Sequence, residues 1–287
     1  MTLDKNTNIL IVGLGLMGGS YAMALTKKGY SVNCLTLEQK DIDYAKEKGM
    51  IKEGSTQLDE RLIKEAQLIV FALYPTAFVS WIEKNQMLLS PNTVITDVTG
   101  VKGSVVKRVQ SILRPDVEYI AAHPMAGRER SGVEFADDKV FCGANYIVTP
   151  TEKNTKEAIC LAKRLGEELG FSRITELSPT EHDEMIAFLS QLTHCIAVTL
   201  MTCNEKEGLE KYTGDSFRDL TRISKINDVM WSELFLLNRD ELLAQMNAFA
   251  AEFERFRKYL ENGEREEMQK IMRKAGARRA LFDKKQV

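Results

Sequence analysis

The sequence of 287 residues has almost no excess of charge of either sign, and its cysteines show no pattern. Lys and Arg total 39 against 41 for Asp and Glu, so no net field favours nucleic acid or an anionic membrane as a partner. An anionic small molecule must then be held by a few individually placed cations. The five cysteines are scattered without a Cys-x-x-Cys pair, which argues against both a disulfide framework and a zinc site. We therefore expect no metal and a reducing, cytoplasmic location.

Long uncharged stretches are also rare, and one of them needs an explanation. The segment 8–25 is almost free of charge, as a signal peptide or a membrane span would be. It contains four glycines, however, and no basic stretch precedes it. A tight turn between a strand and a helix explains these features better than a targeting role. We expect no membrane association from this segment.

Short apolar runs alternate with helical patterns from the N-terminus to about Leu177. Their length and β-branched content are typical of buried strands, and the stretches between them are long enough for helices. This alternation predicts an α/β domain of the Rossmann type, with a doubly wound, largely parallel sheet whose last strand runs antiparallel at an edge. The predicted strands are Asn8–Val12, Ser31–Leu37, Gln67–Leu73, Thr93–Val98, Tyr119–Ala122, Asn145–Thr149 and Arg173–Leu177.

The pattern changes to an all-helical one after Leu177. Ser178-Pro179-Thr180-Glu181 has the N-cap residue, the proline and the glutamate of a capping box, and no convincing strand follows. We expect a dinucleotide-binding domain of residues 1–177 and a helical domain of residues 178–287 that binds substrate and dimerises. One later helix carries an apolar stripe, which is either helix–helix core or a dimer seam. The stripe consists of Leu242, Met246, Phe249, Phe253, Phe256 and Leu260.

A glycine-rich loop follows the first predicted strand and precedes a helical pattern. In Gly-x-Gly-x-x-Gly, Gly13 permits the tight turn, Gly15 lets the backbone approach a pyrophosphate, and Gly18 lets helix and strand pack closely. The glycine spacing alone is a weak signal, but the order of strand, loop and helix predicts dinucleotide binding. The candidate cofactor-binding residues are Gly13, Leu14, Gly15, Leu16, Met17, Gly18 and Thr36.

The end of the second predicted strand leaves the coenzyme open between NAD and NADP. NAD-selective sites usually carry an acidic residue there, which accepts a hydrogen bond from the ribose 2′-hydroxyl. The corresponding residue is Thr36. Glu38 could reach the ribose, whereas Lys40 could meet a 2′-phosphate. We favour NAD, with NADP as the alternative.

His123 directly follows the predicted strand Tyr119–Ala122 and precedes a proline. We expect it at the carboxyl end of a parallel strand, where doubly wound sheets bind their ligands. A histidine in this place is as easily structural as catalytic. The polar, glycine-containing segment 128–132 is predicted to form part of a cleft.

Several motifs, taken together, resemble the prephenate/arogenate dehydrogenase family. They occur in the family's order over nearly the whole chain, and two of them are quite specific. They are Thr96-Asp97-Val98, His123-Pro-Met-Ala-Gly, Glu181-His182-Asp183, Ser190-x-x-x-His194 and Phe217-Arg-Asp-x-Thr-Arg-Ile223. The resemblance implies oxidative decarboxylation of prephenate to 4-hydroxyphenylpyruvate, with hydride transfer to NAD(P)+, in tyrosine biosynthesis. We separately expect a homodimer, because the apolar stripe from Leu242 to Leu260 is wide and would form an aggregation-prone patch if it were exposed.

The resemblance further implies roles for individual residues. His123 matches the catalytic histidine, a neutral imidazole that takes the proton of the substrate 4-hydroxyl. Arg222 matches the arginine that binds a substrate carboxylate through its planar fork of donors. The other implied substrate-site residues are His194, Glu129, Ser190 and Trp231. Ser190 and Trp231 have structural roles as an alternative, and His182 could merely cap its helix or face solvent.

The chain departs from the family around the expected pocket. Gly100 stands where many members carry a serine that hydrogen-bonds the histidine and the substrate, so Thr99 or a water would have to replace that hydroxyl. Gln191 and Ser216 replace a frequent histidine and a frequent glycine. These changes bear on the choice of substrate more than on the type of reaction.

Three other functions stay open at this point. Arogenate dehydrogenase differs only in the side chain of its substrate. Other Rossmann hydroxyacid dehydrogenases generally use a lysine on the first long helix of the second domain, but none occurs here between Pro179 and Lys206. A nucleotide sensor without catalysis would not need both His123 and Arg222.

Overall fold

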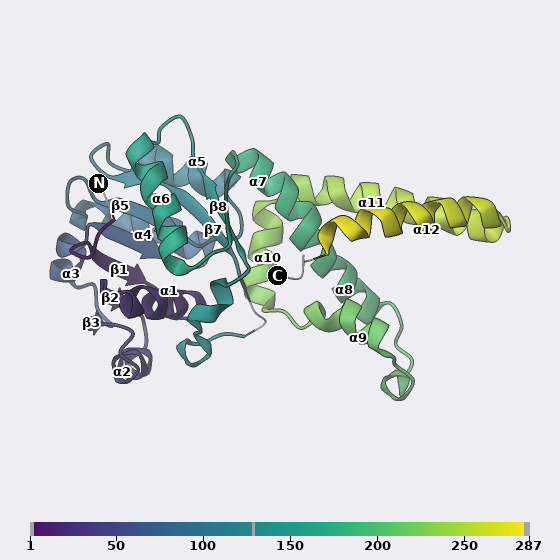
Figure 1. The fold of residues 1–287 in the computed structure, drawn as a ribbon, viewed down its shortest axis with the longest axis horizontal. Coiled ribbons are helices and arrows are strands. Elements are labelled where there is room, and N and C mark those ends of the chain that lie inside the picture. Colours follow the sequence, from purple (N-terminus) through teal and green to yellow (C-terminus); the bar gives the residue numbers. More distant parts are fainter. Residues whose placement is uncertain (1–2, 128–129, 284–287) are drawn as a thin grey trace. The chain divides into compact units, whose positions relative to one another are not determined.

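The computed structural model describes residues 3–127 and 130–283 (Figure 1). The chain divides into two compact units, Met1–Arg239 and Asp240–Val287. The first unit contains two sheets and a set of helices. The second contains the remainder of the C-terminal helices.

The main sheet consists of six parallel strands in the order β3-β2-β1-β4-β5-β6. This confirms the predicted Rossmann-type sheet. One strand, β3, was not predicted, because its three residues are only partly buried and include a glycine. The strands are β1 Asn8–Val12, β2 Ser31–Leu35, β3 Glu53–Ser55, β4 Leu68–Phe71, β5 Val94–Asp97 and β6 Glu118–Tyr119. The helices between them are α1 Leu16–Lys27, α2 Gln39–Glu47, α3 Glu60–Glu65, α4 Pro75–Asn85 and α5 Gly103–Ile112.

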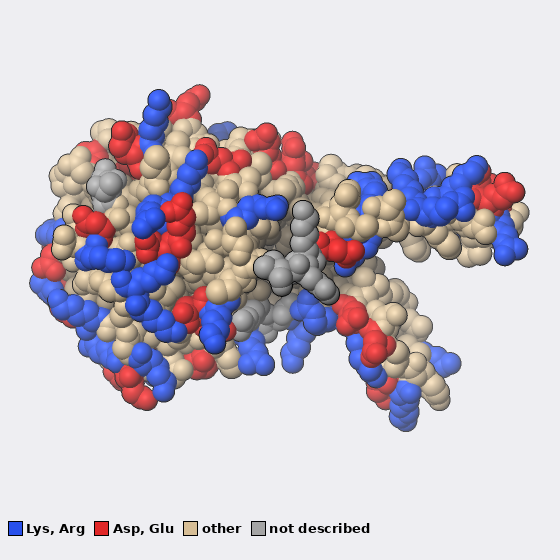
Figure 2. All heavy atoms as spheres, viewed as in Figure 1, with Lys and Arg blue, Asp and Glu red and all other residues tan. Residues whose placement is uncertain are grey.

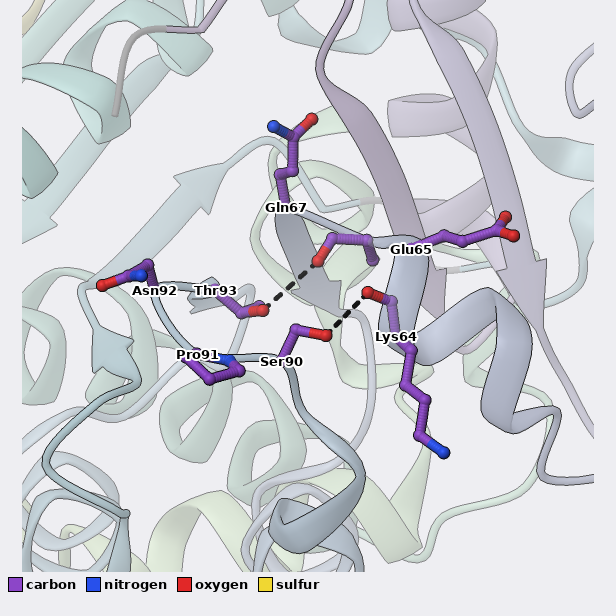
Figure 3. Close-up of a pocket in the computed structure, with 8 residues that line it drawn as sticks. Lys64, Glu65, Gln67, Ser90, Pro91, Asn92 and Thr93 are labelled. Carbon is purple, nitrogen blue, oxygen red and sulfur yellow. Dashed lines mark hydrogen bonds between the residues drawn. The ribbon is translucent and has the colours of Figure 1, made fainter.

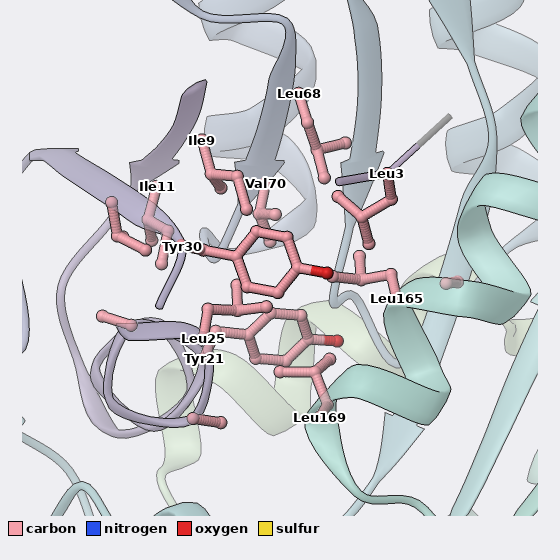
Figure 4. Close-up of a cluster of buried hydrophobic side chains, with 14 of the residues drawn as sticks. Leu3, Ile9, Ile11, Tyr21, Leu25, Tyr30, Leu68, Val70, Leu165 and Leu169 are labelled. Atoms are coloured by element: carbon pink, nitrogen blue, oxygen red, sulfur yellow. The ribbon is translucent and has the colours of Figure 1, made fainter. Parts of the chain in front are cut away.

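Successive residues of the central strand β1 enter two different cores. Ile9 and Ile11 belong to one cluster, while Leu10 and Val12 belong to the other, as the period of two in a strand requires. The first cluster includes residues of α1 and of α6 (Lys156–Leu169), and Figure 4 shows the side chains that pack there. The second includes residues of α4 and α5. Burial on both faces explains why these strands are continuously apolar.

A second sheet contains β7 (Ala121–Met125), β8 (Asn145–Thr149) and β9 (Arg173–Glu176) in that order. The predicted strand Tyr119–Ala122 is in fact split between β6 and β7. His123 lies in the middle of β7, opposite Ile147 of β8. The prediction of a parallel strand ending at His123 is therefore wrong.

The directions in this sheet also differ from the expectation. β7 and β8 are antiparallel, whereas β9 is parallel to β8, so the predicted antiparallel strand at the end of the domain is wrong. The reason lies in the connections. The segment between β7 and β8 contains only the short 3-10 helices η2 (Val133–Phe135) and η3 (Asp138–Phe141), while α6 forms a helical crossover from β8 to β9, which parallel strands require.

A series of helices completes the first unit. Ser178 and Glu181 form both halves of the predicted capping box at the start of α7. A π-helix (η4, Ala187–Leu192) connects α7 to α8, so that the three elements form one continuous helical segment. The elements are α7 Pro179–Ile186, α8 Thr193–Thr202, α9 Asp215–Thr221, the 3-10 helix η6 Arg222–Ser224 and α10 Asp228–Leu237.

The continuous helical segment Pro179–Thr202 is long and apolar enough to be a candidate membrane span by length and composition. An 18-residue window within it has a mean hydropathy of 1.5, and 28% of that window is buried in the described structure. It nevertheless contains the buried residues His182 and Asp183, whose partners lie in the globular first unit. We therefore interpret it as a helix of the folded domain with an exposed apolar face.

The second unit contains most of α11 (Arg239–Glu261) and α12 (Arg265–Arg279). Within the predicted apolar stripe of α11, Leu242 is buried, but Phe249 and Phe253 are 41% and 66% exposed and stack on each other. Part of the stripe is therefore exposed in the single chain.

Acidic and basic side chains are interspersed over the face of the first unit that Figure 2 shows. The mixture agrees with the near-zero formal charge of the chain.

Candidate active site

The glycine loop has the geometry that a dinucleotide requires. Gly13 has φ +96°, and a Cβ there would lie 2.5 Å from the carbonyl oxygen of Ala72. A Cβ at Gly18 would lie 2.0 Å from the carbonyl oxygen of Gly13. A Cβ at Gly15, in contrast, would meet no atom within 4 Å. Gly15 is also the N-cap residue of α1, and no side chain caps this helix. The N-terminus of α1 therefore begins beside open space. Free N–H groups at a helix N-terminus bind phosphate.

The other predicted coenzyme residues surround this loop. Leu14 and Leu16 lie on either side of Gly15, and both are buried. Thr36 directly follows β2 and donates its backbone N–H to Ser55 at 3.1 Å. Glu38 and Lys40 are both exposed beyond it.

A second cluster is organised by the buried carboxylate of Asp97 at the end of β5. Asp97 accepts hydrogen bonds from Lys102 Nζ at 2.5 Å, from the Thr99 N–H at 2.9 Å and from the Tyr119 hydroxyl at 2.9 Å. Lys102 Nζ also donates to the carbonyl oxygen of Ala122 at 2.6 Å. Burial lowers the pKa of Lys102, and the charge of Asp97 opposes that shift. This hydrogen-bonded ion pair fixes the residue that precedes His123.

Thr99 belongs to the same cluster. Its side chain is buried, and its hydroxyl contacts the Asp97 carboxylate and the carbonyl oxygen of Val101. The hydroxyl that was expected to replace the family's serine is thus engaged inside the protein.

His123 is the first member of a chain of three side chains. Its Nδ1 lies 2.8 Å from His182 Nε2, and His182 Nδ1 lies 2.7 Å from an oxygen of Asp183. The Asp183 carboxylate also accepts the backbone N–H groups of Lys102 and Gly103 at 2.8 and 2.7 Å, where α5 begins. The partial positive charge of that helix terminus stabilises the carboxylate.

The hydrogen-bond chain determines where each proton lies. An ionised carboxylate only accepts, so His182 donates from Nδ1 to Asp183 and keeps its lone pair on Nε2. Nδ1 of His123 must then donate to that lone pair. A neutral His123 therefore carries its own lone pair on Nε2, which is the atom a general base needs.

Burial keeps both imidazoles neutral at pH 7. It lowers the pKa of His123 well below its ordinary value, and electrostatic interactions with His182 and with Lys102 oppose its protonation further. Burial also lowers the pKa of His182, against the opposing hydrogen bond to Asp183. His123 is thus ready to accept a proton at neutral pH.

His182 is the residue that the sequence interpretation undervalued. It is fully buried, so the alternative in which it faces solvent is wrong. The signal was the adjacent Asp183, because a His-Asp pair in a first helical turn can direct one imidazole nitrogen.

The structure brings three of the predicted substrate-site residues together. His194 on α8 and Trp231 on α10 stack with ring centroids 3.7 Å apart. His194 Nδ1 donates to the carbonyl oxygen of Ser190, in the π-helix, at 2.8 Å. Ser190 thus contributes its carbonyl to this contact. A π-helix within an α-helix is frequent at functional sites, because it redirects the side chains of one turn.

Three further positions complete the comparison with the sequence. Arg222 is exposed and begins η6, which packs against α8. A Cβ on Gly100 would lie 3.5 Å from Leu234 and 3.9 Å from His123 Cε1, so the position of the family's serine is beside the His123 ring. Glu129 lies outside the described residues.

A small polar hollow lies at the amino-terminal ends of β4 and β5, away from the carboxyl end of β5 where Asp97 lies (Figure 3). The Ser90 hydroxyl donates to the carbonyl oxygen of Lys64, and the Thr93 hydroxyl donates to that of Ala66. These groups satisfy one another, and we assign no ligand to the hollow. Among the residues that the structure describes, no group of His, Cys, Asp or Glu is placed to hold a metal ion.

Two family descriptions match the chain, and together they span most of it. Residues 21–175 match "Prephenate dehydrogenase, nucleotide-binding domain", and residues 178–274 match "Prephenate dehydrogenase, dimerization domain". The first match alone includes more than half of the chain.

Individual proteins agree with this assignment. The chain is 29% identical to prephenate dehydrogenase of Bacillus subtilis, over 93% of this chain and 74% of that protein. It is 28% identical to cyclohexadienyl dehydrogenase of Zymomonas mobilis, over 90% of this chain and 89% of that protein. Its structure is similar to that of prephenate dehydrogenase from Aquifex aeolicus in complex with hydroxyphenyl propionate and NAD+, with a TM-score of 0.90, 29% identity, and 99% and 100% of the two chains covered. The chain therefore belongs to the prephenate dehydrogenase family of NAD-binding oxidoreductases.

Proposed function

We propose that this enzyme oxidises prephenate to 4-hydroxyphenylpyruvate and CO2 in tyrosine biosynthesis, with His123 as the general base. The observation that carries the proposal is the chain His123–His182–Asp183, which leaves a neutral Nε2 on His123. Family membership supports the substrate, and the open space at Gly15 supports NAD+ as the coenzyme.

The chemistry requires one proton acceptor and one hydride acceptor. NAD+, held at the glycine loop, supplies the hydride acceptor for the hydrogen on ring C4. His123 Nε2 takes the proton of the 4-hydroxyl as the carbonyl character develops. The ring carboxylate leaves as CO2, and its bonding electrons complete the aromatic ring. The overall equation releases no proton, so His123 returns its proton to the phenolic oxygen of the product.

The remaining substrate contacts are proposals from the family motifs. Arg222 is proposed to bind a substrate carboxylate through its guanidinium. His194, Trp231 and Ser190 are proposed to form a wall of the pocket, which their mutual contacts support. Glu129 stays in the proposed set on its motif alone. For Thr99, its engagement with Asp97 favours a structural role.

The test is an assay that combines two substrates with two coenzymes. Purified protein is given prephenate or arogenate with NAD+ or NADP+, and reduced nicotinamide is followed by its absorbance. We expect the highest kcat/KM for prephenate with NAD+. A clear preference for arogenate would transfer the assignment to that substrate, and no turnover in any of the four combinations would refute the proposed function.

We propose further that the enzyme is a homodimer. The match of residues 178–274 to a dimerization domain supports this, as do the exposed apolar side chains within that range. These include Phe188, Leu189, Met201, Leu243, Met246, Phe249, Phe253 and Leu260. A stable monomer at micromolar concentration in light scattering would contradict the proposal.

The domain boundary and the cellular location are proposed on separate grounds. A boundary at residues 177/178 is supported by the end of β9 at Glu176, by the capping box at Ser178 and by the junction of the two family matches. A cytoplasmic location is supported by the five cysteines, all of which are free thiols in the structure.

A further inference from the structure

Two buried amide side chains join parts of the site that carry different functions. Gln191 lies in the π-helix and Asn238 directly follows α10, and the two side chains are 1% and 5% exposed. Asn238 Nδ2 donates to Gln191 Oε1 at 2.8 Å and to the backbone carbonyl oxygen of Asp183 at 3.0 Å. Gln191 Nε2 donates to the backbone carbonyl oxygen of Leu234 at 3.1 Å.

These three bonds connect the base to the substrate wall. Asp183 ends the hydrogen-bond chain that fixes His123. Gln191 neighbours Ser190, whose carbonyl oxygen holds His194. Leu234 is one turn after Trp231 on α10. A Cβ on Gly100 would contact both the Leu234 side chain and the His123 ring, so both lie beside Gly100.

We propose that Asn238 and Gln191 are positioning residues, which hold the Trp231–His194 wall at a fixed distance from His123 during catalysis. This inference rests on the proposed function, because it assigns the wall to substrate binding. The two amides act through other residues and need not touch substrate themselves.

Physical chemistry favours this role over simple filling of space. Gln191 is buried in the π-helix, and an unpaired amide in a buried position is strongly unfavourable. Each amide meets its partners in only one orientation, since the two donors of Asn238 face two oxygens and Gln191 must then present its own oxygen to Asn238. Apolar packing would tolerate sliding of α10 along the π-helix, whereas this directional network does not.

Isosteric carboxylates test the hydrogen bonds while preserving the shape of the side chains. Asn238→Asp places oxygens against two oxygen acceptors, and Gln191→Glu keeps the acceptor but loses the donor to Leu234. We expect kcat/KM for prephenate to fall by about tenfold to a hundredfold, as for the loss of a buried hydrogen-bond partner. Both kcat and KM should change, because the base and the wall are connected.

A matched control is available in the Rossmann domain. Gln86 Nε2 donates to the carbonyl oxygen of Ile112 at 2.9 Å, and its Oε1 accepts the N–H of Arg114 at 2.9 Å. Gln86→Glu removes the same kind of donor from a bridging amide at a site that the reaction does not use. It should leave kcat and KM within about twofold of the parent, the usual scatter for a site uncoupled from catalysis.

A second measurement does not depend on activity. The chain has two tryptophans, so Trp81→Phe leaves Trp231 as the sole tryptophan emitter. The stack on His194 shields this indole, and in that background Asn238→Asp and Gln191→Glu should raise the acrylamide quenching constant by at least about twofold, as an indole gains solvent access. Gln86→Glu should not.

The outcomes separate the inference from the proposed function. Unchanged quenching in folded variants would overturn the inference, whatever the activity. Changed quenching with unchanged kcat and KM would overturn the link to catalysis. Failure of the parent to oxidise prephenate would refute the proposed function, while quenching would still decide whether the amides hold the wall. If the carboxylates prevent folding, Gln191→Met removes both bonds without a charge and carries the same expectation.

Discussion

Nδ1 of His123 lies 2.8 Å from Nε2 of His182. The two residues come from different elements, a short antiparallel strand and the first turn of α7, and 59 positions separate them in the sequence. The contact determines which nitrogen of His123 is basic, and several predictions rest on it.

Replacement of the base should affect chemistry more than binding. We expect His123→Asn to lower kcat by about 10²–10⁴-fold, the usual effect of losing a positioned base. KM should change little, since asparagine can still hydrogen-bond the substrate hydroxyl. Steady-state kinetics with prephenate would measure both constants. A near-normal kcat would remove His123 from the role of base.

Two substitutions of His182 should differ from each other. His182→Leu removes the acceptor for His123 Nδ1, so the base loses its selected tautomer and kcat should fall on the order of 10²-fold. His182→Gln retains an oxygen that can accept this bond, and it should recover at least part of the loss. Equal activity of the two variants would contradict the tautomer argument.

The lowered histidine pKa values predict an acid limb in the activity profile. His123 must be neutral to accept a proton, and burial lowers its pKa well below the ordinary value. kcat/KM for prephenate should therefore be flat near pH 7 and above, and should fall only in acid, below pH 6.5. An acid limb centred above pH 7 would show that His123 is not the titrating group or is not buried as described.

The same shifts predict how stability depends on pH. His123 and His182 have lower pKa values in the folded protein than in the unfolded chain, where histidine titrates near 6.5. The unfolded chain therefore binds more protons in acid. Their contribution to the free energy of unfolding should be constant above about pH 7 and should fall below pH 6.5, by up to about 1.4 kcal/mol per pH unit for each histidine. Urea titrations across this range would measure it, and His123→Asn with His182→Gln should flatten the dependence.

Two glycines of the coenzyme loop should respond differently to the same methyl group. Gly15→Ala enters open space, so the free energy of unfolding should change by less than about 1 kcal/mol. The methyl would nevertheless occupy space beside the pyrophosphate, and the Kd for NAD+ should rise at least about tenfold. Gly18→Ala would contact the carbonyl oxygen of Gly13 and should lower the free energy of unfolding by about 1–3 kcal/mol. Thermal unfolding and titration of the protein fluorescence with NAD+ would separate the two effects.

A hydroxyl at position 100 should be accommodated. The contacts of a Cβ there, 3.5 Å to Leu234 and 3.9 Å to His123 Cε1, are of ordinary van der Waals length. We expect Gly100→Ser to fold with a stability within about 1 kcal/mol of the parent and to raise kcat/KM, because its hydroxyl can bond both the imidazole and the substrate. Gly100→Ala is the control, and equal kinetics of the two variants would exclude a contribution from the hydroxyl.

The sequence predicted those features of the fold that depend on local patterns. The continuous apolar runs, the glycine loop and the capping box at Ser178 were located correctly. The strand β3 was missed because a partly exposed segment around Gly54 has no strong β pattern. The direction of β7 was missed because alternation of apolar residues does not reveal which strand will be the neighbour.

The candidate site was predicted less completely, because its important contacts join distant segments. His123 and the residues of the wall were identified from motifs, but the partner of His123 is 59 residues away and is fully buried. The roles of Gln191 and Asn238 depend on a π-helix and on the packing of α10, and neither has a signature in a single sequence.

The base and the pair that directs it lie on opposite sides of the proposed domain boundary. His123 is part of the second sheet, whereas His182 and Asp183 lie in the first turn of α7, where Asp183 accepts the first N–H groups of α5 and a hydrogen bond from His182. The two domains are consequently not interchangeable modules, one for coenzyme and one for substrate. In a chimera between family members joined near residue 177, activity would depend on whether the incoming helix can reach the start of α5.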